Sequence, residues 1–444
     1  MTRLERWLAA RETLALWSIL VVGFVFRLGW LFLRPEERLR PHESEMWRVA
    51  VAFARTGTLA DAYRPGSGIS SHVGPFNTIL AGMVYRVFGV GTLPSELIMA
   101  VGAAAVAAAL FWALYRVAAE LGIPIVPRLA ALAFLSLLPL NFYFEVVDFR
   151  IREAAFGAMI AAVGLLWLLR IDKACAAGVP LTMRWLAIFA LLAAFAFLIN
   201  PGLSLGLYAG IAIVALRHLA VRDWLPGVAV GLAALVVING AWVIRNWEVY
   251  HRIMPSRGNF GLELAIGNHP AAVTPADARA VFNARMQAIH PAFGAGALAR
   301  LKSYPSDVAY FDVVGAEAKA WIADHPGDFA RLSLRHLREL YFPPAWQWNL
   351  YADSPARGVV VKQALKWAIA ALGLAMLLVG LFERPRQWLF VAFALAFPTA
   401  LYMIVQPTLR YRYVLEGLLV FLAAALVWRL VSVLVTRLAP ARAA

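Results

Sequence analysis

Long runs of apolar residues, separated by short polar segments, organise most of this chain. Because an α-helix rises 1.5 Å per residue, about 20 apolar residues are needed to cross roughly 30 Å of hydrocarbon. Candidate runs lie near residues 14–33, 93–118, 128–145, 150–170, 183–200, 202–219, 224–243, 360–381, 387–405 and 413–436. The runs are continuously apolar, which favours helices over alternating strands. The pattern therefore predicts an all-α polytopic membrane protein with about ten transmembrane helices.

One further apolar stretch, 75–90, is short, starts at Pro75 and carries Arg86 near its end. If 75–90 crosses the membrane, the basic loops face outward for most of the chain. If it does not, every short cytoplasmic loop is basic, as the positive-inside rule requires. We therefore predict that both termini are cytoplasmic and that 75–90 is a helix at the outer interface.

The polar segments divide the chain into three parts. Residues 1–245 form an N-terminal transmembrane module that includes an outer loop, 34–92. Residues 246–358 form a small, mainly helical extracytoplasmic insertion, and 359–444 form the C-terminal transmembrane helices. In the outer loop, apolar positions at i, i+3, i+4 and i+7 predict an interfacial helix over 43–55. In the insertion, Thr274-Pro275 predicts a helix start, with Thr274 as N-cap, and a second helix is predicted after His325.

The composition agrees with a membrane protein and excludes other classes. Hydrophobic residues make up 62% of the chain and charged residues only 15%, as is typical of membrane proteins. The net charge is +15, but the basic residues cluster at the ends of apolar runs, so topology explains them better than nucleic-acid binding does. The single cysteine, Cys175, excludes an intramolecular disulfide, and its basic loop predicts the cytoplasmic side.

Two segments on the predicted outer side carry carboxylates. Glu43 and Glu45 open the first outer helix, where a carboxylate can act as a general base if burial raises its pKa. The alternative is that both are solvated charges on a surface helix. The short outer turn that includes Asp148, Arg152 and Glu153 is costly next to hydrocarbon unless its charges pair or face a wet cavity. Asp148 and Arg152 are spaced i, i+4, so simple ion pairing is an open alternative.

Cationic side chains also gather on the predicted outer side. Arg64 and His72 lie in a turn rich in glycine and proline, and Arg410 and Arg412 precede the last span. Arginine forks suit phosphate geometry; an ordinary outer loop, or snorkelling to lipid headgroups, is the alternative. Residues 242–246, Trp-Val-Ile-Arg-Asn, lead into Gly258-Asn259-Phe260-Gly261 and Gly267-Asn268-His269. Taken alone, this segment is only a turn-rich exit from a span.

The order of these motifs resembles that of the GT-C glycosyltransferases that use polyprenyl-phosphate sugars, the bacterial relatives of protein O-mannosyltransferases and of lipid A aminoarabinose transferase. The resemblance covers nearly the whole chain, and no single motif in it is specific. The matching motifs are Glu43 with Trp47, the segment His72-Val73-Gly74-Pro75, Phe88-Gly89, the acidic turn 148–153, Asn200-Pro201-Gly202, Trp242 to Asn246, Gly267-Asn268, and Arg410-Tyr411-Arg412.

The resemblance implies a GT-C fold and an inverting transfer of a sugar from polyprenyl (undecaprenyl) phosphate to an acceptor hydroxyl at the outer face of the inner membrane. It implies Glu43 as the base, with Glu45, Asp148 and Glu153 as alternative or supporting acids. The residues expected at the donor phosphate are Arg64, His72, Arg410 and Arg412, with Arg245 and Asn246 in support.

The family more often has Asp and Tyr where this chain has Glu43 and Trp47, so Glu45 remains a rival base. The expected partners are the lipid-linked donor, a lipid, glycan or protein acceptor, and membrane lipids, with no nucleic acid. No cofactor is required and no metal-binding residues are predicted; a divalent metal is compatible with the chemistry. The alternatives are a lipid-linked-sugar flippase, which would carry ionisable residues midway along its spans, and a non-catalytic envelope assembly protein.

Overall fold

The computed structural model describes residues 3–41, 43–348, 350 and 358–438, and these residues are mainly helical. The helices are α1(Arg3–Ala9), α2(Glu12–Phe32), α3(Pro35–Arg38), α4(Glu45–Thr56), α5(Pro75–Phe88), α6(Leu93–Glu120), α7(Ile125–Leu137), α8(Phe142–Val146), η1(Asp148–Arg150), α9(Ala154–Ala176), α10(Met183–Ile199), α11(Pro201–His218), η2(Val221–Asp223), α12(Trp224–Tyr250), α13(Phe260–Gly267), α14(Pro270–Val273), α15(Ala278–Ile289), α16(Ala295–Leu301), α17(Asp307–Asp324), α18(Pro326–Tyr341), α19(Ala345–Trp348), α20(Val359–Glu383), α21(Pro385–Ile404) and α22(Tyr413–Leu438).

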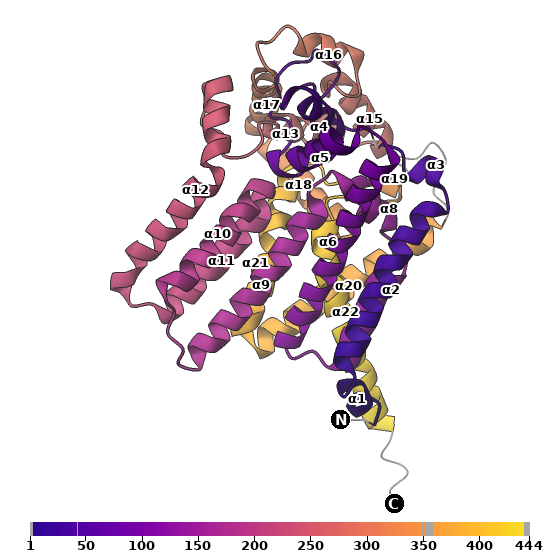
Figure 1. Cartoon of the computed structure of the whole chain (residues 1–444), viewed down its shortest axis with the longest axis vertical. Coiled ribbons are helices and arrows are strands. Elements are labelled where there is room, and N and C mark those ends of the chain that lie inside the picture. The colour runs from indigo at the N-terminus through magenta and orange to yellow at the C-terminus, as the bar shows by residue number, and fades with distance from the viewer. Residues whose placement is uncertain (1–2, 42, 349, 351–357, 439–444) are drawn as a thin grey trace, which may run out of the picture.

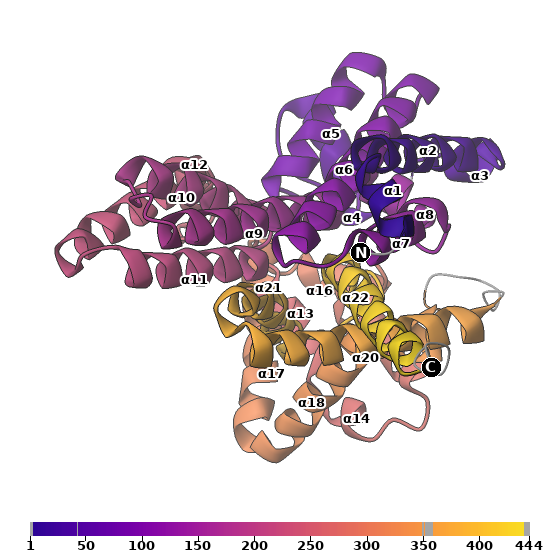
Figure 2. The same ribbon diagram turned by 90° about the horizontal axis from the view of Figure 1, so that it is seen from below.

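The molecule has two layers (Figure 1). The long apolar helices run side by side as a bundle, and the outer loop with α4 and α5 joins the insertion, α13–α17, in a cap over one end. We call this cap the outer domain. Helix α1 and the end of α22 lie at the opposite end. From below, α10, α11 and α12 form a group at one side of the bundle, away from α20 and α22 (Figure 2).

The chain is a multi-pass membrane protein. In the described part, seven helices are long and apolar enough to cross a membrane, or eight if the bent pair α7 and α8 is one span. The seven are α2, α6, α9, α12 with η2, α20, α21 and α22. Helix α10 is apolar but has only 17 residues. The all-helical polytopic fold is confirmed, and the count of ten spans stays a prediction.

The predicted span 128–145 is broken into two helices in the structure. Helices α7 and α8 meet at an angle of 65°. Pro139 explains the break, because a proline disfavours helical backbone at the preceding residue, and Leu138 is extended with ψ of 128°. The run 150–170 also begins later than predicted, at Ala154, because Asp148–Arg150 form a separate 3-10 turn.

Arg27, on α2, forms hydrogen bonds with backbone carbonyl groups at the end of α7, where the helix breaks. Its guanidinium donates hydrogen bonds to the carbonyl oxygens of Leu135 at 3.0 Å and Ser136 at 2.8 Å. It also forms a buried ion pair with Glu145 at 2.7 Å. Irregular backbone inside a membrane domain is tolerated only where such partners are available. This arginine, which is 2% exposed, was missed in the sequence, where α2 reads simply as an apolar run.

The two helices predicted in the first outer loop are present as α4 and α5, and the loop also contains the one-turn α3. Helix α4 buries Met46, Val49 and Ala50, and α5 packs against it so closely that a Cβ on Gly82 would lie 2.6 Å from the Phe53 ring. With 14 residues, α5 is about 21 Å long, shorter than the hydrocarbon layer. The two helices therefore belong to the outer domain (Figure 1).

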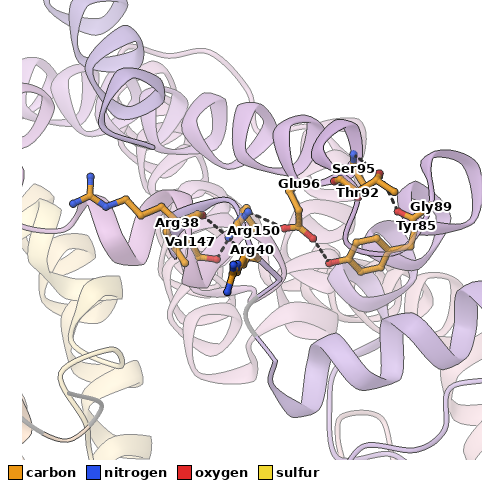
Figure 3. A network of polar contacts seen from close by, with 9 residues as sticks. All are labelled: Arg38, Arg40, Tyr85, Gly89, Thr92, Ser95, Glu96, Val147 and Arg150. Atoms are coloured by element: carbon orange, nitrogen blue, oxygen red, sulfur yellow. Dashed lines mark hydrogen bonds and ion pairs between the residues drawn. The ribbon is translucent and has the colours of Figure 1, made fainter. Parts of the chain in front are cut away.

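A buried polar network fixes this loop to the bundle (Figure 3). Arg150 forms an ion pair with Glu96 of α6 at 2.7 Å and donates to the carbonyl oxygens of Arg38 and Arg40. The Tyr85 hydroxyl, at the end of α5, donates to the other Glu96 oxygen at 2.9 Å. The ion pair between Arg150 and Glu96 thus fixes both the segment that precedes α4 and the end of α5.

In the insertion, the predicted helix start at Thr274 is wrong. Thr274 instead follows α14, and the next helix begins at Ala278 with Asp277 as N-cap, whose side chain accepts a hydrogen bond from the Ala280 N–H at 3.1 Å. Asp277 is an equally good N-cap and lies closer to the helical residues. The helix predicted after His325 is confirmed as α18.

Candidate functional site

A cavity of about 490 Å³ lies where the outer domain meets the bundle, and we call it the outer cavity. The start of α4, the loop before α5, and helices α13 and α15 line it from the outer domain. The bundle contributes the outer ends of α9, α11, α21 and α22. Elements from all three predicted parts of the chain therefore meet at this one site.

One end of the outer cavity holds a carboxylate and two histidines. Glu45 is the first residue of α4, which Ser44 caps by accepting a hydrogen bond from the Trp47 N–H at 3.3 Å. His72 comes from the loop before α5, and His290 follows the last residue of α15. Candidate ligand atoms of Glu45, His72 and His290 all lie within 4.8 Å of one another. We call these three residues the triad.

The triad is buried, and burial and neighbouring charges together set its charge. Burial lowers the pKa of His72 from 6.5 to about 3, against the opposing effect of Glu45, and it lowers the pKa of His290 in the same way. Burial would raise the pKa of Glu45, but His290, Arg152 and His72 outweigh it and lower that pKa to about 2. At neutral pH the triad therefore consists of an ionised carboxylate and two neutral imidazoles.

Such a set can hold a divalent metal ion, because two neutral imidazoles and a carboxylate are its usual ligands. His72 Nδ1 is buried without a hydrogen-bond partner, which agrees with a ligand role. Sequence analysis predicted no metal-binding residues, since Glu45, His72 and His290 are far apart in the chain and follow no metal-ligand spacing.

Arg152 connects the triad to the acidic turn. Its guanidinium lies 3.7 Å from Glu45 and 2.9 Å from Asp148. The predicted i, i+4 pairing of Asp148 with Arg152 is therefore present. Asp148 is buried but does not line the outer cavity, so it acts on the site through Arg152, by orienting the guanidinium beside Glu45.

The other end of the outer cavity carries arginines and two more carboxylates. Arg257 pairs with Glu153 at 2.7 Å, and Arg410 lines the wall nearby. Burial raises the pKa of Glu263, with Arg257 and Arg410 opposing it. The Asn259 side chain donates a hydrogen bond to this carboxyl at 3.2 Å. This end therefore offers cationic groups for an anion, together with hydrogen-bonding groups.

Of the ten predicted site residues, Glu45, His72, Glu153 and Arg410 line the outer cavity, and the other six do not. Glu43, the predicted base, precedes α4 and is exposed, and Arg64 is exposed in its turn. Neither is among the cavity-lining residues. Glu45 lines the outer cavity because it is on the first turn of α4, and α4 packs against the rest of the outer domain.

Arg412 does not line the outer cavity and forms its contacts within the bundle. It is 1% exposed, pairs with Glu416 at 2.8 Å and donates to the Lys366 carbonyl oxygen at 2.9 Å. Lys366 also pairs with Glu416. The charge of this arginine is thus compensated by a carboxylate of the protein itself, four residues further along the chain.

Arg245 and Asn246 lie beside the site and hold its backbone. Arg245 donates to the carbonyl oxygens of Leu59 at 3.3 Å and Ser70 at 3.1 Å, and the Asn246 side chain donates to the Met254 carbonyl oxygen at 2.8 Å. Both contacts fix segments that lead directly to cavity residues, His72 in one case and Arg257 in the other. These contacts anchor the backbone beside the site, and the supporting role of the pair at the donor stays a prediction.

Three cavity residues were missed in the sequence: Arg257, Glu263 and His290. All belong to the insertion, and each is an isolated polar residue in a segment that reads as an ordinary extracytoplasmic domain. The only available signal was Arg257 in the glycine- and asparagine-rich stretch 257–261, which sequence analysis treated as a turn.

Comparison with solved structures identifies the fold. The chain is similar to the archaeal oligosaccharyltransferase AglB from Archaeoglobus fulgidus, solved with an inhibitory peptide and a dolichol-phosphate, with 16% identity, a TM-score of 0.51 and coverage of 98% of this chain and 52% of AglB. It is also similar to ArnT from Cupriavidus metallidurans bound to undecaprenyl phosphate, with 15% identity, a TM-score of 0.35 and coverage of 96% and 79%.

The chain spans about half the length of AglB. No family model and no curated protein sequence matches it. The likeness to AglB nevertheless extends over nearly all of the present chain, so the protein has the GT-C-type membrane fold that sequence analysis predicted.

Proposed function

We propose that this protein is a membrane glycosyltransferase that moves a sugar from a polyprenyl-phosphate carrier to an acceptor hydroxyl, with inversion, at the outer face of the inner membrane. One observation carries the proposal: a chain with this fold places a buried carboxylate and three arginines in one cavity between the bundle and the outer domain. The similar AglB structure contains a dolichol-phosphate, a carrier of the proposed class.

The arginine end of the outer cavity suits the donor phosphate. Arg257 and Arg410 present guanidinium groups beside the outer ends of α21 and α22, where a polyprenyl chain can lie against the bundle. Departure of the carrier leaves negative charge on its phosphate, and fixed cations stabilise that charge as it develops. Arg64 and Arg412, which do not line this cavity, are not part of the proposed phosphate site.

Glu45 takes the role of base that was first assigned to Glu43. A proton moves from the acceptor hydroxyl to Glu45 while the hydroxyl oxygen attacks the anomeric carbon and the bond to the carrier phosphate breaks. A general base works best with a pKa near the working pH. Since the pKa of Glu45 is about 2, we expect its contribution at the lower end of the usual range, about 10²-fold.

The triad also fits a divalent cation, held by Glu45, His72 and His290. Such an ion would supply positive charge to neutralise phosphate oxygens. The role of Glu45 then becomes that of a ligand, and Glu263, with its raised pKa, is the next carboxylate to consider as base. Metal analysis of the purified protein, with transfer assayed before and after chelation, separates the two roles of Glu45.

The test of the proposed function is direct. Purified protein is incubated with labelled undecaprenyl-phosphate sugars and a cell-envelope extract, and the label is followed into lipid, glycan and protein fractions. We expect transfer that is lost in Glu45→Gln and retained in Glu43→Gln. Label that crosses the membrane of a sealed vesicle without changing its carrier would instead favour a flippase.

A further inference from the structure

A second hollow, of about 530 Å³, adjoins the outer cavity and is lined by none of the triad residues. It is formed between the end of α12, the loop that follows it and one face of α17, with Trp247, Arg252, Asp312 and Lys319 among its lining residues. The last turns of α12 rise beside α17 at the edge of the outer domain (Figure 1). It shares Arg257 and Phe260 with the outer cavity.

The length of α12 places this hollow at the depth of lipid headgroups. The helix begins at Trp224 and has 27 residues. Its first 20 residues rise about 30 Å, which equals the thickness of the hydrocarbon layer. Trp247 therefore lies just beyond that layer, in the zone where tryptophan is favoured.

An apolar track leads from the hydrocarbon to the hollow. Val236, Val237, Ile244 and Trp247 are 70%, 71%, 59% and 52% exposed, and their spacing places them, with Gly240, on one face of α12 about 100° wide. Helix α12 lies at the edge of its group, beside α10 (Figure 2). This face is therefore available to an acyl chain, and it ends at the hollow because Trp247 belongs to both.

The charges of the hollow match one phosphodiester. Arg257 is neutralised by Glu153, which leaves Arg252 and Lys319 against Asp312. Arg252 pairs with Asp312, and Lys319 is exposed with no ion pair among the described residues. The local balance is one positive charge, which complements a phosphodiester with one negative charge.

We propose that the second hollow binds the phosphodiester headgroup of an anionic membrane phospholipid. Arg252 and Lys319 hold the phosphate, and an acyl chain lies along the face of α12 that ends at Trp247. The lipid would brace the outer end of α12 against α17. The two proposed phosphate contacts are distinct from the donor site, because neither Arg252 nor Lys319 lines the outer cavity.

The test compares two double variants by native mass spectrometry. The first, Arg252→Ala with Lys319→Ala, removes the proposed phosphate contacts. The control, Arg300→Ala with Lys302→Ala, also removes one ion-paired arginine and one exposed lysine from the outer domain. We expect the first variant to bind dioleoyl-phosphatidylglycerol about a hundredfold more weakly than the wild type, the loss expected for two charge-assisted hydrogen bonds. The control should bind as the wild type does.

Three results would overturn the proposal. They are equal retention of phosphatidylglycerol by both double variants, equally tight binding of phosphatidylcholine, and displacement of phosphatidylglycerol by millimolar inorganic phosphate or by undecaprenyl phosphate. If the first variant does not fold, as judged by size exclusion, the same comparison is made with Lys319→Gln, which alters one exposed side chain.

Discussion

Asp307, on α17, accepts a 2.6 Å hydrogen bond from the Ser70 hydroxyl, although the two residues are 237 positions apart. The same carboxylate accepts a hydrogen bond from the Ser71 N–H at 3.1 Å, and the His72 N–H donates to the Ser70 oxygen at 3.1 Å. The insertion thus holds the backbone that presents His72 to the outer cavity.

Replacing Asp307 with alanine should therefore displace His72, although Asp307 is not itself a member of the triad. The change leaves the buried Ser70 hydroxyl and the Ser71 N–H without their acceptor, which costs about 1–3 kcal/mol for each group. We expect lower thermal stability and reduced sugar transfer. Asp324→Ala, at the exposed end of α17, is the control. Unchanged transfer in Asp307→Ala would show that His72 needs no support from the insertion.

The two carboxylates of the first outer helix should behave differently. Glu45→Gln removes the buried acceptor and should lower the transfer rate by about 10²-fold, while donor binding persists. Glu43→Gln alters an exposed side chain and should have little effect. The opposite result would return the role of base to Glu43. If neither change matters, Glu263→Gln and Glu153→Gln are the variants to assay next.

The arginines should separate into a donor-binding pair and a structural one. Arg410→Ala and Arg257→Ala should weaken binding of undecaprenyl phosphate about tenfold by removing charge-assisted contacts. Arg412→Ala leaves Glu416 with one partner fewer in a buried cluster, and breaking such a pair costs about 3–5 kcal/mol. We expect it to lower the melting temperature. Arg64→Ala should leave both binding and stability unchanged, and weakened binding there would place the phosphate outside the outer cavity.

Acid should destabilise the fold through His72. The pKa of this residue is lowered by burial from 6.5 to about 3, so the unfolded chain binds a proton near pH 6.5 and the folded chain does not. Stability is therefore complete above pH 6.5 and falls with decreasing pH, by on the order of 2 kcal/mol at pH 5 for this residue. His72→Gln should show a smaller decrease in melting temperature on acidification, and an equal decrease would contradict burial of the neutral form.

Orientation can be tested with the native cysteine. Cys175 lies at the end of α9 opposite the outer domain, and the insertion carries the exposed Ser303. In intact cells an impermeant maleimide should label Ser303→Cys, combined with Cys175→Ser, and should not label Cys175 in the native chain. External labelling of Cys175 would reverse the predicted topology.

Local patterns predicted those elements that depend on local signals. The apolar runs, the amphipathic helix α4 and the Asp148–Arg152 pair all follow from spacing within a few residues. Pro139, which breaks the third run, was also visible in the sequence, but its effect was underestimated because the flanking residues remain apolar.

The site itself depends on contacts between distant segments. His290 meets Glu45 only because α15 folds back over the start of α4, and no spacing in the chain encodes that meeting. The choice between Glu43 and Glu45 depended on which face of the helix start is covered by the rest of the outer domain. Arg412 was assigned to a phosphate although Glu416, at i+4, was visible in the sequence. Its other partner, Lys366, lies on α20, and no spacing in the chain encodes that contact.

The buried ion pair between Arg27 and Glu145 has a consequence for the biosynthesis of the protein. The two residues are 118 positions apart, so at 5–20 residues per second the ribosome needs roughly 6 to 24 s to make Glu145 after Arg27. During that interval α2 carries an arginine whose place in a lipid-exposed helix costs about 2.5–3.5 kcal/mol. We therefore expect α2 to remain beside the translocon, or at a chaperone of membrane insertion, until the broken third segment emerges. Arg27→Leu should release the nascent α2 into lipid earlier.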